Sequence, residues 1–193
     1  MSTPTDAFSK QEVLPCKQGV TQWKVKEKNL KQIWKRALKG EIRERGEGKS
    51  FGWALASGPV RGKLSQIVAL LKDPYTIKDR EQATVTVEEN GTIQNRKIHT
   101  SPLGIMDVDW QETWHFEDSG ADKLIWYQKT AGTKHIEHLC GRIFLKQQDT
   151  NTVWIVLFEE LEASHRGSND ILKGHEGTFK TLIKLSSAQS SNP

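Results

Sequence analysis

Between residues 83 and 163 the chain alternates apolar and polar residues in six short runs, and no other feature limits the possible folds as strongly. The runs pair around turn sequences at residues 89–91, 118–120 and 149–151, the first of which contains the hairpin-forming dipeptide Asn-Gly. A period of two with short turns predicts an antiparallel meander. A further strand from Phe51 gives one sheet of about seven strands, which is too wide to lie flat and must curl.

Segments with helical spacing lie before, within and after these strands. One covers about residues 22–39, a second is "GPVRGKLSQIVALLKDP", and a third follows Ser168, a suitable N-cap. The last helix is the obvious cover for the concave face of a curled sheet. We therefore predict a basic N-terminal extension in residues 1–49, an α+β domain in residues 50–185 and a disordered tail in residues 186–193.

The order strand, helix, six-strand meander and closing helix resembles the helix-grip fold of the START/polyketide-cyclase (SRPBCC) superfamily. The segment "GPVRGKLSQIVALLKDP" is similar to the family's first helices in composition and position, and the resemblance spans residues 50–185. It implies a curved sheet of about seven strands wrapped around a long C-terminal helix. It also implies a deep cavity between them for a lipid, sterol, polyketide or other apolar molecule, which the protein would bind and, as a further expectation, transport.

Three charged residues interrupt otherwise apolar strand faces: Glu112, Arg142 and Glu159. Glu112 lies between Trp110 and Trp114 in "DWQETW", where an unpaired carboxylate would cost several kcal/mol. Three interpretations stay open at this point. Glu112 lies beyond the rim of the core, or pairs with an arginine on a neighbouring strand (Arg96 or Arg142), or orients a ligand in the cavity.

The inner face of the sheet and the last helix supply the candidate ligand-binding residues. They are Trp110, Glu112, Trp114, Trp126, Arg142, Phe144, Phe179, Leu182 and Ile183. We favour a non-enzymatic binding protein. The alternatives are a cyclase or hydrolase that uses Glu112, His138 or Arg142 as acid–base or oxyanion-stabilising groups, and an interaction module whose interior is filled by side chains.

Two glycines, Gly174 and Gly177, fall inside the last predicted helix, where each costs about 1 kcal/mol relative to alanine. Close approach of the helix to the sheet or to a ligand would offset that cost. Equally, the helix could begin only at Thr178, with residues 168–177 forming a loop.

The N-terminal extension concentrates positive charge. Residues 17–49 hold eleven Lys or Arg against four Glu, a net charge of +7, whereas the whole chain carries +4. Tryptophan and lysine on an amphipathic helix suit peripheral contact with an acidic membrane surface. The simpler interpretation is that Trp23, Ile33, Trp34 and Leu38 dock on the domain while the lysines face solvent. Nucleic acid is disfavoured as a partner.

No sequence motif for binding a metal or a cofactor stands out, and we expect the protein to use neither. His135 and His138 lie three residues apart on a strand and so point to opposite faces, and no third ligand is obvious. Cys140 is expected to be a small core residue, although a disulfide with Cys16 is open. Because no secretory signal is visible, we expect a cytoplasmic protein, or an exported one if a signal was removed before residue 1.

Overall fold

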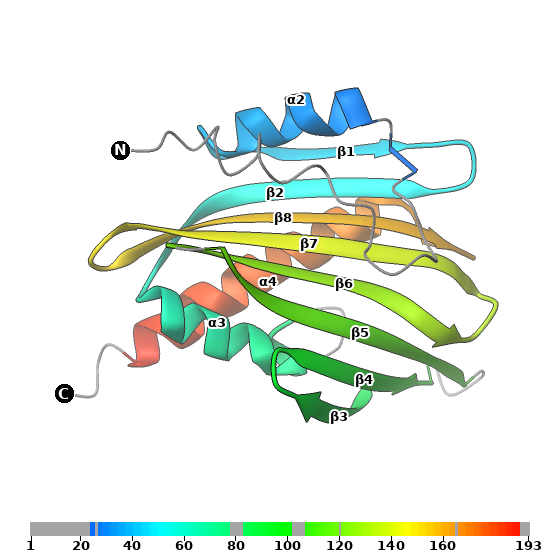
Figure 1. The fold of residues 1–193 in the computed structure, drawn as a ribbon. Helices are drawn as coiled ribbons and strands as arrows, with labels where there is room; N and C mark the ends of the chain where they lie inside the picture. The colour runs from blue at the N-terminus through cyan, green and yellow to red at the C-terminus, as the bar shows by residue number, and fades with distance from the viewer. Residues whose placement is uncertain are drawn as a thin grey trace.

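The computed structural model describes residues 24–25, 27–77, 83–101, 107–119, 121–164 and 166–189. They form one eight-stranded antiparallel sheet in the order β1-β2-β8-β7-β6-β5-β4-β3, with helices on both faces (Figure 1). The elements in chain order are α2 (Glu27–Ala37), β1 (Arg43–Glu47), β2 (Gly52–Arg61), α3 (Leu64–Lys72), η1 (Pro74–Thr76), β3 (Thr84–Asn90), β4 (Ile93–Thr100), β5 (Val108–Ser119), β6 (Asp122–Gly132), β7 (Ile136–Asp149), β8 (Thr152–Ala163) and α4 (Ser168–Gln189).

The meander and its turns are confirmed. β3 and β4 join through Gly91, which has a φ of +61°, as the Asn-Gly dipeptide predicts. The strand number is one higher than expected, because residues 43–47 of the predicted extension pair with β2 instead of breaking the chain. Four of the five residues of β1 are charged and none is apolar, so hydrophobic alternation could not reveal this strand.

One face of the sheet packs against α4 and α3 and carries the main core. Ala54 and Ala56 of β2 lie beneath Phe179 and Leu182 of α4 in this core. We call this side the grip face. α4 is a continuous helix from Ser168, so the alternative of a loop over residues 168–177 is wrong. The helix also continues to Gln189, past the predicted end at residue 185.

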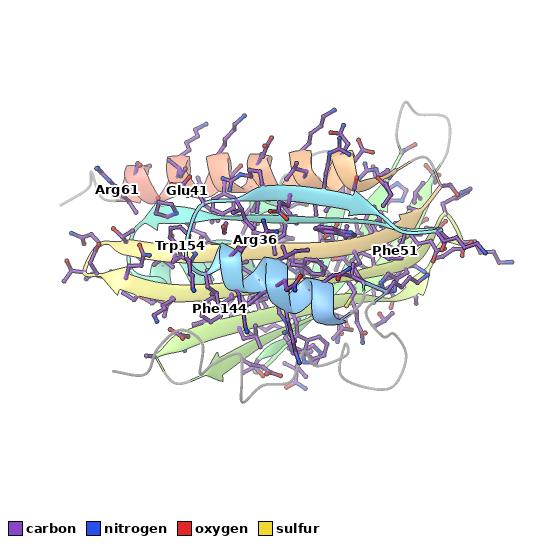
Figure 2. The ribbon with its side chains drawn as sticks, turned by 90° about the horizontal axis from the view of Figure 1, so that it is seen from above. Arg36, Glu41, Phe51, Arg61, Phe144 and Trp154 are labelled. Atoms are coloured by element: carbon purple, nitrogen blue, oxygen red, sulfur yellow. The ribbon has the colours of Figure 1, made fainter. Side chains whose placement is uncertain are left out.

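The opposite face, which we call the back face, is covered by α2. Leu30, Ile33 and Trp34 of α2 form a second core with Leu55 and Phe158 of the sheet. Figure 2 shows α2 lying over the sheet on the side away from α4, near Trp154 and Phe144. The docked helix confirms the simpler interpretation of the basic segment for Ile33, Trp34 and Leu38, while Trp23 lies outside the described residues.

A buried carboxylate fixes the start of this back-face helix. Glu160 is completely buried and accepts hydrogen bonds from the backbone N–H groups of Lys24 (2.9 Å) and Val25 (2.7 Å). Its Oε2 also lies 3.2 Å from Nε2 of His138. At the other end of α2, the indole N–H of Trp154 donates to the carbonyl of Ala37 at 2.9 Å. Polar bonds therefore hold both ends of α2 on the sheet.

We expect Glu160→Ala to loosen α2 without unfolding the sheet, because two backbone N–H groups lose their acceptor. Tryptic cleavage within residues 24–39 should become about tenfold faster, since proteolysis follows local opening. Glu162→Ala is the matched control: Glu162 pairs with the side chain of Lys24, and such partly exposed pairs contribute little. Equal cleavage of the two variants would show that Glu160 is not the anchor.

Cys140 is completely buried, as predicted, but its sulfur is disulfide-bonded and not a free thiol. The sequence has one other cysteine, Cys16, which lies outside the described residues. Among the described residues, no helix combines the length and the apolar character needed to cross a membrane.

Candidate functional site

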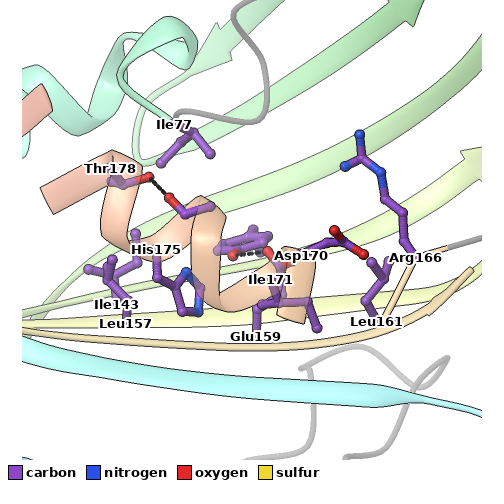
Figure 3. Close-up of a pocket in the computed structure, with 12 residues that line it drawn as sticks. Ile77, Ile143, Leu157, Glu159, Leu161, Arg166, Asp170, Ile171, His175 and Thr178 are labelled. Carbon is purple, nitrogen blue, oxygen red and sulfur yellow. Dashed lines mark hydrogen bonds between the residues drawn. The ribbon is translucent and has the colours of Figure 1, made fainter. Parts of the chain in front are cut away.

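A small pocket lies between α4 and the grip face, at the place where the sequence led us to expect a ligand chamber (Figure 3). Its volume is about 30 Å³, close to that of one water molecule. Sites for drug-sized ligands measure roughly 300–1,000 Å³. The expected deep cavity is therefore not open in this structure, because core side chains fill the space. Its lining residues are Ile77, Tyr127, Ile143, Leu157, Glu159, Leu161, Arg166, Asp170, Ile171, Gly174, His175 and Thr178.

The sheet side of the pocket carries a buried hydrogen bond between two strands, β6 and β8, that flank β7. The hydroxyl of Tyr127 on β6 donates to Oε2 of Glu159 on β8 at 2.5 Å. The intervening strand β7 contributes Gly141, which is paired with both residues. A Cβ added at Gly141 would lie 1.9 Å from Cζ of Tyr127. Gly141 therefore gives the tyrosine ring the room to cross β7 and reach the carboxylate.

An aromatic and cationic stack extends from this pair along the grip face. The Trp114 ring lies 4.0 Å from the Tyr127 ring at an interplanar angle of 9°, and the Arg96 guanidinium lies 3.9 Å from the centre of the Trp114 ring. Arg96 also donates to the carbonyls of Leu71 (3.0 Å) and Lys72 (3.2 Å) at the end of α3. The stack thus connects the pocket wall to the helix that covers this part of the sheet.

The structure also explains how Glu112 is tolerated on an apolar face. Glu112 is 1% exposed, and its two oxygens accept hydrogen bonds from the indole N–H groups of Trp110 (2.7 Å) and Trp114 (2.8 Å). Arg96 lies directly opposite it in the β4–β5 pairing, whereas Arg142 lies on the other face of the sheet. The interpretations that Glu112 lies beyond the rim or pairs with Arg142 are therefore wrong.

On the helix side, the pocket is bordered by Gly174, in the first half of α4. A Cβ added at Gly174 would meet no atom within 4 Å, so this glycine borders open space. Close approach of backbone is therefore not what offsets its cost. The buried side chain of His175 lies between α4 and the sheet, and Thr178 donates to the carbonyl of Gly174 at 2.9 Å (Figure 3). Asp170 and Arg166 complete the polar part of the lining.

The nine predicted site residues do not form one site. Trp110, Glu112 and Trp114 lie on the grip face but do not line the pocket, and Phe179 and Leu182 pack into the main core beside it. The remaining four residues lie elsewhere: Trp126, Arg142, Phe144 and Ile183.

Trp126, Arg142 and Phe144 face the opposite side of the sheet from the one we predicted. Trp126 pairs with Arg142 and Arg142 with Phe158, which belongs to the core under α2, as Phe144 does. Trp126 donates its indole N–H to Glu117 at 3.0 Å. Ile183 is 48% exposed and cannot roof a cavity.

Burial alters the ionisation of Arg142 on this back face. Desolvation lowers its pKa to about 10, and the neighbouring negative charge of Glu117 partly opposes that shift. The charged form of Arg142 is thus less stable in the folded chain than in water, so its charge opposes folding at neutral pH. That cost falls as the pH rises through about 10.

The enzymatic alternative loses its common site. Glu112 lies on the grip face, whereas Arg142 and the His138–Glu160 pair lie on the back face beneath the start of α2. The part of the chain that the structure describes contains no group of three or more potential metal ligands. Because they lie on opposite faces of the sheet, Glu112 cannot act together with His138 and Arg142 on one substrate.

The basic side chains of the extension are also divided between the two faces. On β1, Arg43 contacts Phe179 and Arg45 bonds to Ser168, both on α4, while Arg36 of α2 pairs with Glu44 on the back face. A shallow groove of about 460 Å³ lies there, between α2 and the edge of the sheet. Arg45 and Arg36 both line this groove. Contact with an acidic membrane surface stays a prediction.

Sequence reasoning missed the residues that line the pocket. Glu159 was noticed as a charge in an apolar run, and His175 falls on the apolar stripe of the last helix, but Tyr127 carried no signal. Gly174 did carry a signal, because a glycine inside a helix costs about 1 kcal/mol relative to alanine and therefore needs an explanation.

Several solved structures share this fold. Human StAR-related lipid transfer protein 5 matches with a TM-score of 0.59 and 12% identity, over 85% of this chain and 94% of its own. Zhui aromatase/cyclase from Streptomyces sp. R1128 matches with a TM-score of 0.57 and 11% identity, over 74% and 97%. TTHA0849 from Thermus thermophilus gives 0.54 and 16%, over 72% and 99%. No family model and no curated protein sequence matches the chain. These likenesses establish the fold, a helix-grip arrangement in which an antiparallel sheet packs against a long C-terminal helix.

Proposed function

We propose that the protein binds a small apolar molecule that carries a hydroxyl or similar neutral polar group, between α4 and the grip face. The observation that carries this proposal is the unfilled space beside Gly174, in the middle of a helix where alanine would be more stable by about 1 kcal/mol. A chain selected for stability alone would fill that space. Keeping it open at a cost favours a role for the space itself.

The lining chemistry supports this class of ligand. Ile143, Leu157 and Ile171 offer an apolar wall, and the Tyr127–Glu159 pair offers buried oxygen acceptors beside it, which suit the O–H of an alcohol. A free fatty acid would bring its carboxylate near Glu159 and Asp170, with one arginine to balance them, so an alcohol suits the pocket better.

Binding requires the pocket to enlarge, since about 30 Å³ holds no more than a water molecule. The part of the pocket able to yield is α4, which rests on the sheet through side-chain contacts, whereas the strands hold one another by backbone hydrogen bonds. We infer that α4 moves away from the sheet when the ligand enters. Transport of the molecule, the role named for the human protein above, would depend on the same opening.

The test uses Gly174→Leu, which places a side chain in the open space. The probe is a fluorescent long-chain alcohol, and the readout is quenching of tryptophan fluorescence. We expect the affinity for the probe to fall more than about tenfold, because the leucine side chain occupies the space that the probe needs and a loss of about 1.4 kcal/mol in binding free energy corresponds to a factor of ten. The helix itself should not suffer, because leucine is the better helix former. Lys173→Leu, which adds the same side chain at the neighbouring exposed position, should bind as the unmodified protein does.

The second candidate is the interaction module with a filled interior, which the small pocket volume favours. The same measurements separate the two. If native mass spectrometry finds no co-purified molecule and the unmodified protein shows no quenching by the fluorescent alcohol, the ligand-binding proposal fails and the filled interior stands.

A further inference from the structure

We propose that β1, the edge strand from the N-terminal extension, acts as a latch that holds α4 against the sheet and so controls how readily the pocket opens. The regulatory part of this inference rests on the proposed function. The latch itself rests on contacts between β1 and α4 at two separate points along the helix.

The first point is the start of the helix. The backbone N–H of Ser168 donates to Oε1 of Glu47 at 2.9 Å, and Nη1 of Arg45 donates to Oγ of Ser168 at 3.2 Å. Ser168 is completely buried by this arrangement. A Cβ added at Gly52 would lie 2.5 Å from the nitrogen of Ser168, so the helix start also sits tightly on β2. Glu47 therefore supplies an acceptor for a helix N–H that has no partner within the helix.

The second point is three turns further along the helix. The guanidinium of Arg43, at the other end of β1, lies 4.7 Å from the centre of the Phe179 ring. Arg43 is in turn fixed by its Nη1, which donates to the carbonyl of Ser57 at 2.5 Å. Phe179 is buried in the main core, so the arginine closes the core on its solvent side.

These two points enclose the functional part of α4. All five α4 residues that line the pocket lie between Ser168 and Phe179: Asp170, Ile171, Gly174, His175 and Thr178. A strand that holds the helix on either side of this stretch restrains the whole helical wall of the pocket. Glu44 on the same strand faces α2 instead and takes no part in the contact.

The latch is weak enough to open. Arg43, Arg45 and Glu47 are exposed residues, and hydrogen bonds or cation–π contacts at exposed sites each contribute little. The contacts differ in this respect from the core beneath them, where Ala54 and Ala56 pack under Leu182. Because these contacts are weaker than the packing of the core, their loss should loosen the pocket-lining stretch of α4 without unfolding the domain.

The experiment measures amide hydrogen exchange in the full chain with the double substitution Arg43→Ala/Glu47→Ala. We expect exchange of the amides of residues 170–179 to become about tenfold faster, with the amides of β7 unchanged. Glu44→Ala is the matched control, because it removes a carboxylate from the same strand on the other face. Glu47→Gln alone provides a milder variant should the double variant fold poorly, with a smaller acceleration expected in the same amides.

A second measurement separates the latch from the proposed function. Release of the fluorescent long-chain alcohol from the double variant should accelerate by about the same factor as the exchange. If exchange accelerates while even the unmodified protein binds no probe, the latch stands and the ligand proposal falls. If residues 170–179 exchange at the same rate in the double variant as in the Glu44→Ala control, β1 is not a latch, whatever the protein binds.

Discussion

Replacing Glu112 by alanine is expected to lower the free energy of unfolding by about 4 kcal/mol, a large share of the total for a domain of this size. The carboxylate is buried and accepts from two indole N–H groups, which would both lose their acceptor inside the core. The substitution would also remove the carboxylate that lies directly across from Arg96 in the β4–β5 pairing. Urea denaturation followed by far-ultraviolet circular dichroism measures the change.

Two variants make the Glu112 result specific. Glu112→Gln keeps one oxygen acceptor but presents an amide N–H to the other indole, so its loss should lie between those of the alanine variant and the unmodified protein. Gln111→Ala removes an exposed neighbour on the other face and should change stability by less than about 0.5 kcal/mol. A Glu112→Ala protein as stable as the Gln111→Ala protein would refute the structural role of the two indole bonds.

Gly141→Ala is the second substitution with a large expected effect, a destabilisation of about 3 kcal/mol from overpacking. The added methyl group would overlap the Tyr127 ring, whose Cζ lies 1.9 Å from the new atom. The ring would have to leave both Glu159 and the Trp114 stack, because one ring position serves both contacts. Thermal and urea unfolding measure the loss, and near-ultraviolet circular dichroism reports on the aromatic stack.

A double substitution identifies the cause of the Gly141 effect. Tyr127→Leu removes the ring, so Gly141→Ala should cost much less in that background than in the unmodified protein, and the two changes should be strongly non-additive. Gly174→Ala is the contrasting control, because a methyl group there meets no atom within 4 Å and should add about 1 kcal/mol of helix stability. Additive effects at Gly141 and Tyr127 would contradict the packing argument.

The order of elements and the hairpin turns could be predicted because their causes are local. The Asn-Gly turn between β3 and β4 needs only its own backbone preference, and the alternation in β5 arises because one side of that strand faces solvent. The long closing helix followed from a stripe of apolar residues after Ser168. Each of these features can be identified within about twenty residues of sequence.

The candidate site could not be predicted, because the central strands are buried on both faces. In β7 eight consecutive residues from His138 to Leu145 are buried, so no polar side marks which residues face the grip. Arg142 and Phe144 do lie on one face of β7, but that face packs against α2. The size of the pocket was equally inaccessible, because it depends on how distant side chains such as Ile77 and His175 fill the same space.

The two outer strands of the described sheet have a consequence for the behaviour of the protein in solution. β1 has five residues, four of them charged, and β3 ends in Glu88, Glu89 and Asn90. An open sheet border invites another chain to add its own strand, and short, charged borders oppose such growth. Concentrated samples should consequently resist fibre formation through these edge strands. β1 then stays free to contact α4 of its own chain instead of pairing with a strand of another molecule.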